Sequence, residues 1–512
     1  MAPLLRFTRD ISPNLAGRSD ALTELSIGEL QGRLRRRELK PSELTEAHLA
    51  RIAAVNPVLN AVIGDRSAAA QAEARLADAV LARTPDAELH KLPALFAIPC
   101  TVKEFFGVAG QPHTGGMMRR AGNRAGSDCT VVERLRQAGA IVLGVTNVPE
   151  GGLWMETHNL IYGRTRNPWN LAHTSGGSSG GEGAIVAAGG APFGIGSDVG
   201  GSIRIPAAFC GTVGHKPSGG LIPLHGHFPP PLGSSQFLVG GPLCRRVADV
   251  MPLLRVMAGP DGHDATCEAL PLGDPEKVEL RALRILTLPA PLRVSDVMRA
   301  AVDASVAALG SQGATVEKLD PELLRGGFAM WMAALTSASA ATYDQMLSDG
   351  AGISLGSELL RLPFGKSSYV LASLVTVLSE RLLQHLPRSL NDMGSHLARL
   401  ERLRRQLDEA LGENGVIIYP PYTRPAPRHH GPLLTPFDVA CTAIWNVLGY
   451  PATVVPVGFD ARGLPVSVQV VARRGLDHVT VAVAAALEKE FGGWRRADPL
   501  AAGGRGEVAA AA

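Results

Sequence analysis

The residues best suited to chemistry lie in two glycine- and serine-rich segments, TSGGSSGG (residues 174–181) and GSDVGGS (residues 196–202). A serine hydroxyl can attack a carbonyl carbon when a base takes its proton. Ser178 and Ser202 are 24 positions apart, which leaves room for a short, apolar, buried helix at 182–188 and a returning strand. That arrangement would bring the two segments to the same edge of a sheet.

The second segment also offers backbone N–H groups. Glycine lets the backbone approach closely because it carries no Cβ, so four amides could converge on one point: those of Val199, Gly200, Gly201 and Ser202. Such an array can bind an anion, or the oxyanion that develops in acyl transfer. The alternative for either segment alone is a turn that needs glycine for a positive φ. A phosphate loop is disfavoured because GxxxxGK[ST] is absent, and a nucleophile elbow because GxSxG does not surround Ser202.

Lysine is the candidate base. Lys103 ends an apolar run, IPCTVKEFFG, where a charge is costly unless it is paired or removed. Burial would lower its pKa and leave a neutral amine that can accept a proton. The alternative is a lysine that reaches solvent or pairs with Glu104. Histidine is the more usual base, but most histidines, including His429 and His430, lie in polar, loop-like surroundings.

The composition argues against several classes of function. The 512 residues carry a net charge of +3 without a basic stripe, which does not favour nucleic-acid binding. No apolar stretch reaches the roughly 18 residues of a membrane span. The six cysteines show no CxxC spacing and HExxH is absent, so we expect reduced core cysteines, no metal and no cofactor. We expect a cytoplasmic protein that acts on a small molecule, and a homodimer is a further expectation.

Strand-like and helix-like patterns alternate along the chain. Strands are expected at 94–102 and 141–147 on either side of a helix at 127–140, and the same order recurs around 283–319. This alternation predicts an α/β fold. We expect one large domain over 25–495, with a helical insertion at about 320–412. An N-terminal arm (1–24) and a flexible tail (496–512) would flank it.

Three ordered motifs carry a family resemblance: GGSSGGEGA, GIGSDVGGSIRIPAAFCGTVGHKPS and TVKEFFG. Together they resemble the amidase signature family, over about residues 25–490. The segments HKPSGGLIPLHGHFP and GGMMRR are most similar to fatty acid amide hydrolases of the second type and their bacterial relatives. The resemblance implies a large mixed twisted β-sheet covered by helices on both faces.

The resemblance also implies amide hydrolysis by a Ser–cisSer–Lys triad. Ser202 would be the nucleophile and form an acyl-enzyme. Ser178 would follow a cis peptide bond and relay the proton, and Lys103 would be the neutral base. The oxyanion hole would be the amide array defined above, from Val199, Gly200, Gly201 and Ser202.

Substrate choice is less well specified. Apolar residues that precede the two serine segments could line the substrate pocket: Met117, Met118, Leu153, Trp154 and Met155. Such a wall favours an apolar acyl or aryl group, and the alternative is that these are ordinary core residues. A second function class is the glutaminase subunit of a tRNA-dependent amidotransferase, and a third is a catalytically silent binding protein on the same fold.

Overall fold

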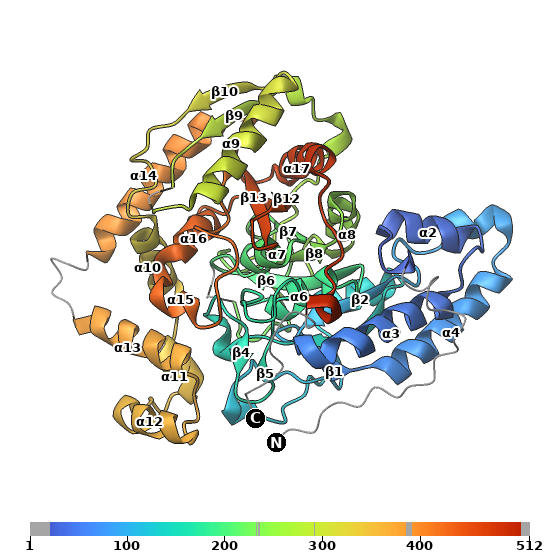
Figure 1. Ribbon diagram of the computed structural model, residues 1–512, viewed down its shortest axis with the longest axis horizontal. Coiled ribbons are helices and arrows are strands. Elements are labelled where there is room, and N and C mark those ends of the chain that lie inside the picture. Colours follow the sequence, from blue (N-terminus) through green and yellow to red (C-terminus); the bar gives the residue numbers. More distant parts are fainter. Residues whose placement is uncertain (1–20, 232, 234–235, 291, 386–391, 503–512) are drawn as a thin grey trace.

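Eleven strands form one mixed sheet that runs through the molecule (Figure 1). The computed structural model describes residues 21–231, 233, 236–290, 292–385 and 392–502. The strand order across the sheet is β1-β3-β2-β6-β8-β7-β12-β13-β11-β9-β10. These strands are β1 (Val62–Asp65), β2 (Pro99–Lys103), β3 (Ile141–Thr146), β6 (Phe193–Asp198), β7 (Val213–Lys216), β8 (Val239–Cys244), β9 (Arg284–Thr287), β10 (Thr315–Lys318), β11 (Gly415–Tyr419), β12 (Ala452–Phe459) and β13 (Pro465–Ala472). A separate pair is formed by β4 (His158–Asn159) and β5 (Gly163–Arg164).

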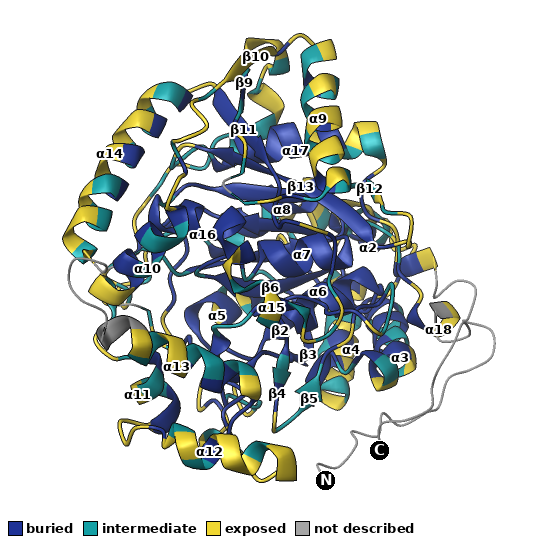
Figure 2. Cartoon of the chain, turned by 60° about the vertical axis from the view of Figure 1, so that its left-hand side comes forward, coloured by how far each residue is buried: buried dark blue, intermediate teal, exposed yellow. Residues whose placement is uncertain are grey.

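Helices flank the sheet, so the α/β prediction is confirmed. They are α2 (Ile27–Arg35), α3 (Pro41–Leu59), α4 (Ser67–Arg83), α5 (Thr130–Gln137), α6 (Gly180–Ala187), α7 (Arg204–Cys210), α8 (Val250–Met257), α9 (Asp296–Ser311), α10 (Gly327–Ala338), α11 (Tyr343–Ser348), α12 (Leu355–Arg361), α13 (Leu371–His385), α14 (Met393–Leu411), α15 (Gly431–Leu434), α16 (Ala440–Val447), α17 (Asp477–Phe491) and α18 (Pro499–Ala502). Figure 2 shows the central strands and α6 and α7 as buried, whereas the edge strand β10 is exposed and α9, α12 and α14 expose their outer faces.

The strand that ends in the candidate base lies in the interior of the sheet. β2 pairs in parallel with β3 on one side and β6 on the other. Every residue of these three strands is buried, as expected for parallel strands covered on both faces. The strand predicted at 141–147 is present as β3, and the strand predicted at 94–102 is present as β2 from Pro99 onward, because residues 94–97 form a turn. β7 and β8 were not predicted, because VGHK and VGGPLC carry the glycine, proline and charge that usually argue against a strand.

The predicted buried helix between the two serine segments is α6. All eight of its residues are buried. Its small residues allow this close packing: a Cβ on Gly183 would lie 2.9 Å from the carbonyl oxygen of Pro206 in α7. α6 is followed directly by β6, so the chain leaves the first serine segment, crosses the core and returns to the second.

The segment predicted as a helical insertion contains α10 to α14. Among its described residues the structure contains helices and turns but no strand after β10 and before β11. α11, α12 and α13 lie together at the lower left of Figure 1 and share a small core that includes Tyr343, Leu347, Leu374 and Val377.

The ordered chain extends beyond the predicted domain limits at both ends. Thr23 is fully buried. At the other end, the N–H of Ala497 donates to the carbonyl of Ala187, and α18 packs against α3. Within this part of the predicted flexible tail, Ala497 and Pro499 are therefore buried, whereas Asp498 and Leu500 are exposed. The rest of the arm and tail predictions falls on 1–20 and 503–512, outside the described residues.

Two other properties of the described chain bear on function. All six cysteines are free and buried, as predicted. Within the described ranges, no helix is both long enough and apolar enough to cross a membrane.

Candidate active site

Lys103, the last residue of β2, is completely buried. Its Nζ lies 2.8 Å from Ser178 Oγ, 3.0 Å from Ser197 Oγ and 3.3 Å from the carbonyl oxygen of Ser197. Burial lowers the pKa of Lys103 to about 7. Three carboxyl groups oppose this change, those of Asp198, Glu182 and Glu104. A substantial share of the lysine is therefore a neutral amine near neutral pH.

The side chain of Glu104, the alternative partner of this lysine, hydrogen-bonds to other residues. Its carboxylate accepts hydrogen bonds from the hydroxyl and N–H of Thr114, the hydroxyl at 2.6 Å, and from the N–H of Gly115 at 3.0 Å. Successive side chains of a strand point to opposite faces, which separates Glu104 from the Lys103 amine. The sequence left open whether the Lys103 amine is a buried base or pairs with Glu104. In the structure its neighbours are Ser178 and Ser197.

The two serine segments meet, as their spacing predicts. The N–H of Ser179 donates to the carbonyl of Ser202 at 3.1 Å. The peptide bond between Gly177 and Ser178 is cis. Glycine is required before it, because a Cβ on Gly177 would lie 2.5 Å from the carbonyl oxygen of Trp154. Ser178 is buried, whereas Ser202 is partly exposed, which is the arrangement that a relay and a nucleophile require.

The loop that carries Ser202 is held by two side chains from distant helices. Trp331 Nε1 in α10 donates to the carbonyl of Val199 at 2.9 Å. Thr442 Oγ1 in α16 donates to the carbonyl of Gly200 at 2.6 Å. Gly201 has φ +132°, and a Cβ there would clash with Thr442. Glycine at this position therefore serves both conformation and close approach.

One of the four amides of the predicted array is already occupied. The N–H of Gly201 donates to Asp198 Oδ1 at 2.7 Å, so this amide is directed into the protein. The array as an oxyanion site then depends on the other three amides, those of Val199, Gly200 and Ser202. The carboxylate of Asp198 fixes the conformation of this loop by accepting a hydrogen bond from a backbone N–H, as an N-cap side chain does at the first turn of a helix.

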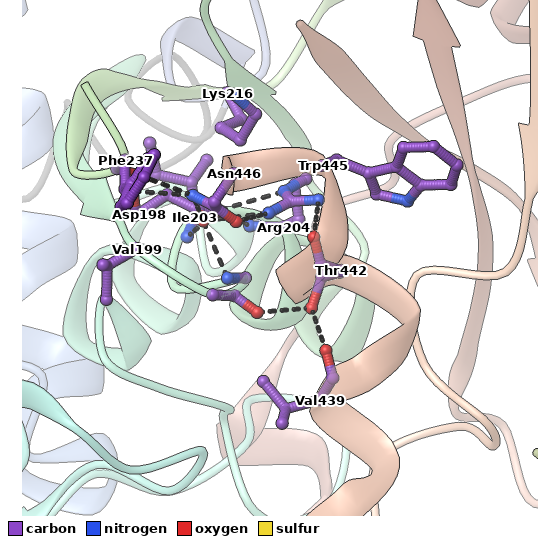
Figure 3. Close-up of polar contacts among 12 residues, drawn as sticks. Asp198, Val199, Ile203, Arg204, Lys216, Phe237, Val439, Thr442, Trp445 and Asn446 are labelled. Carbon is purple, nitrogen blue, oxygen red and sulfur yellow. Dashed lines mark hydrogen bonds and ion pairs between the residues drawn. The ribbon is translucent and has the colours of Figure 1, made fainter. Parts of the chain in front are cut away.

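That carboxylate belongs to a buried ion pair, shown in Figure 3. Arg204 donates to Asp198 from Nη2 at 3.0 Å and from Nε at 3.1 Å, and both side chains are fully buried. Asn446 in α16 donates to Asp198 Oδ1 at 2.9 Å. Burial alone would raise the pKa of Asp198, but the guanidinium of Arg204 holds it well below its ordinary value. Sequence reasoning assigned Asp198 and Arg204 only to a loop and a helix.

A second buried carboxyl lies close to the amine. Glu182 in α6 accepts hydrogen bonds from Thr101 Oγ1 at 2.5 Å and from Thr146 Oγ1 at 2.9 Å. Burial raises its pKa to about 8. Glu182 is therefore ionised less readily than an ordinary glutamate, which weakens its stabilisation of an ammonium at Lys103. Sequence reasoning counted Glu182 only as part of an apolar helix.

Comparison with known proteins decides the family. A sequence model of the Amidase family matches residues 43–481. The chain belongs to the amidase signature family. This amidase is 39% identical over 492 residues to fatty-acid amide hydrolase 2-B of Danio rerio, and the match covers 93% of this chain and 91% of the relative. It is 32% identical over 489 residues to an acylamidase of Rhodococcus erythropolis, at 91% and 95% coverage.

A solved structure agrees with the fold of this amidase. The 6-aminohexanoate cyclic dimer hydrolase has a TM-score of 0.75 to it at 28% identity, and the match covers 93% of this chain and 99% of the other. The predicted fold and the predicted activity, amide hydrolysis by a hydrolase of this family, are both confirmed.

The five predicted wall residues of the amidase do not share one environment. Met117 and Met155 are buried in two different apolar clusters, Leu153 is partly buried against the first, and Met118 is 41% exposed. Trp154 lines a cavity of about 350 Å³. Leu160, Tyr369, Leu371 and Leu433 are also in its lining. The carbonyl oxygen of Trp154 lies close to Gly177, since a Cβ on that glycine would be 2.5 Å from it, so one wall residue of this cavity is adjacent to the segment that carries Ser178.

Proposed function

We propose that this amidase cleaves apolar acyl or aryl amides through an acyl-enzyme on Ser202, with Ser178 and Lys103 as the other triad members. The observation that carries the proposal is the 2.8 Å contact between a fully buried lysine amine and Ser178 Oγ. A buried amine with a pKa near 7 is matched to general-base catalysis near neutral pH.

The proposed proton path runs from Ser202 through Ser178 to Lys103, and its last step uses the contact between Ser178 Oγ and Lys103 Nζ. Ser202 Oγ attacks the carbonyl carbon and gives its proton to Ser178 Oγ, while the Ser178 proton moves to Lys103 Nζ. The carbonyl oxygen becomes an oxyanion and is stabilised by backbone amides of the 199–202 loop. When the tetrahedral intermediate collapses, the C–N bond breaks and the proton returns through Ser178 to the leaving nitrogen. Water then attacks the Ser202 ester by the same relay and releases the carboxylic acid.

The apolar substrate class has two supports. The relatives described above include a fatty-acid amide hydrolase and an acylamidase. In addition, the cavity that Trp154 lines has an apolar part formed by side chains such as those of Leu160, Leu371 and Leu433, beside the charged groups of Glu150, Glu156 and Arg164. An apolar wall that carries some polar groups is typical of sites for hydrophobic acyl or aryl groups.

The alternative is a glutaminase that works within an amidotransferase. The chain is 34% identical over 476 residues to a glutamyl-tRNA(Gln) amidotransferase subunit of Roseiflexus castenholzii. Glutamine is small and charged, so this function predicts little turnover of long apolar amides. The two functions can therefore be separated with substrates alone.

The test is product release by the purified full-length chain. The substrates are glutamine, a long-chain primary fatty amide and an aryl acetamide. Ser202→Ala should lower kcat by at least about a thousandfold. Ser311→Ala, at an exposed serine of α9, is the matched control and should retain full activity. Turnover of the apolar amides without glutamine supports the proposal. Glutamine turnover alone would replace it with the amidotransferase function, and an active Ser202→Ala variant would refute the triad.

The cytoplasmic location, the homodimer and the independence from nucleic acid remain part of this proposal. Light scattering of the purified chain with and without substrate tests the homodimer directly. Fractionation of the producing cell tests the location.

A further inference from the structure

A histidine outside the triad is placed against its base. His227 is 7% exposed and lies in the segment that follows β7. The N–H of the next residue, Phe228, donates to the carbonyl of Phe105 at 2.8 Å, which ties this segment to the end of β2. The imidazole ring stands edge-on to Phe105 and Phe106, with ring centroids 5.7 Å and 4.8 Å apart. The ring is therefore fixed in position and orientation.

The contacts of the ring specify which nitrogen carries the proton. His227 Nδ1 lies 2.6 Å from the carbonyl oxygen of Pro229, which can only accept, so Nδ1 carries a hydrogen. Burial lowers the pKa of His227 to about 3, so the ring is neutral at neutral pH and Nε2 has no hydrogen. Ser197 Oγ lies 2.9 Å from Nε2 and must donate its single hydrogen to it.

The orientation of Ser197 then decides what the lysine amine can do. Since the Ser197 hydrogen is directed to His227, its oxygen offers only lone pairs to Lys103 Nζ, 3.0 Å away. The carbonyl of Ser197, at 3.3 Å, also only accepts. A neutral amine has two hydrogens and one lone pair. With both hydrogens directed to Ser197, the lone pair is left for the hydroxyl of Ser178, at 2.8 Å.

We propose that His227 is a positioning residue that, through the hydroxyl of Ser197, directs the lone pair of Lys103 toward Ser178. This inference rests on the proposed function of the triad. Without His227, the Ser197 hydroxyl is free to rotate and donate to the lysine lone pair, which would occupy the base. The proton relay would then be interrupted although every triad residue remained in place.

The titratable groups around this chain of hydrogen bonds come from several elements. His113 and Lys103 act on His227, and Asp198, Glu182 and Glu104 act on Lys103. Their influence is present in every His227 variant described below, so differences between those variants report the hydrogen bond itself.

The first experiment compares three variants of the full-length chain on an amide that the wild type hydrolyses. His227→Leu removes the acceptor, and we expect kcat to fall about 10- to 100-fold with KM nearly unchanged. His227→Gln offers an amide oxygen to Ser197 and an N–H to Pro229, and should recover most of kcat. His113→Leu is the matched control, because His113 contacts the carbonyl of Phe105 instead of Ser197, and its kcat should remain near wild type.

The second experiment does not depend on turnover. In the 15N NMR spectrum of the histidine-labelled wild type, the signals lost in His227→Gln should show Nδ1 protonated and Nε2 bare. The opposite tautomer, or a protonated ring at neutral pH, would overturn the inference. So would a His227→Leu variant with wild-type kcat, or a folded His227→Gln variant as slow as His227→Leu. Full activity of Ser202→Ala would instead refute the proposed triad. The NMR measurement of the His227 tautomer would still test the hydrogen bonds of His227 and Ser197.

Discussion

Replacement of the buried lysine should abolish activity and remove a pH-dependent cost to the stability of this amidase. Burial lowers the pKa of Lys103 from its ordinary 10.5 to about 7, whereas in the unfolded chain the amine regains the ordinary value. Between these two pH values the unfolded chain binds a proton that the folded chain does not. Folding therefore becomes less favourable as the pH falls from 10.5 to 7, by about 1.4 kcal/mol per pH unit. Below about pH 7 both states are protonated and the cost stays constant.

The total cost over this range is about 5 kcal/mol. Lys103→Met removes it, because methionine is unbranched, apolar and close in length. The variant also loses the hydrogen bonds to Ser178 and Ser197, at about 1–3 kcal/mol for each hydroxyl left unpaired. That loss does not depend on pH. The free energy of unfolding of the variant, relative to wild type, should therefore rise by about 2 kcal/mol between pH 9 and pH 7.5.

Urea unfolding at pH 7.5, 8.25 and 9, followed by circular dichroism, measures this difference, with amide turnover recorded on the same samples. Lys277→Met is the matched control, because Lys277 is exposed and folding does not desolvate its amine. A Lys103→Met difference that is the same at all three pH values would show that the folded amine keeps its proton. The neutral-base mechanism would then be refuted.

Three further predictions concern the same site. For a neutral substrate, kcat/KM should fall below about pH 7, because the protonated base has no lone pair, and a profile flat to pH 5.5 would contradict this. Gly201→Ala should lower kcat by about a hundredfold or more, since its Cβ would displace the loop from Thr442, whereas Gly126→Ala, with nothing within 4 Å, should not. Arg204→Met should lower the free energy of unfolding in urea by about 3–5 kcal/mol, because Asp198 would remain as an unpaired buried charge; adding Asp198→Asn should recover part of that loss.

Local patterns predicted much of the fold. The apolar runs around β2 and β3 and the capped helix between them are properties of neighbouring residues, so the alternating order could be found without tertiary information. The meeting of Ser178 and Ser202 followed from their spacing around α6. β7 and β8 were not predicted as strands, because their sequences contain glycine, proline and lysine. These residues fit in strands here only because of the neighbouring strands of this sheet.

The supports of the site could not be predicted in the same way. Thr442 and Asn446 contact the loop at 198–204 from more than 200 positions away in the chain. No periodicity connects residues so far apart, and only the packing of α16 brings them to the loop. Arg204 carried one usable signal, a charge within an apolar helix, which indicates a buried partner. The sequence around His227 gave no signal of a functional role, since a histidine among glycines and prolines is typical of a surface loop.

The contact between α10 and the nucleophile loop has a consequence for building chimaeras of this enzyme. Trp331 belongs to the helical segment 327–411, yet it holds the carbonyl of Val199, and its ring would lie 2.9 Å from a Cβ on Gly200. A grafted segment that replaces α10 would therefore exchange part of the catalytic scaffold together with the outer helices. Junctions placed after Ala338 and before Met393 would transplant α11 to α13 and leave that tryptophan with its own loop.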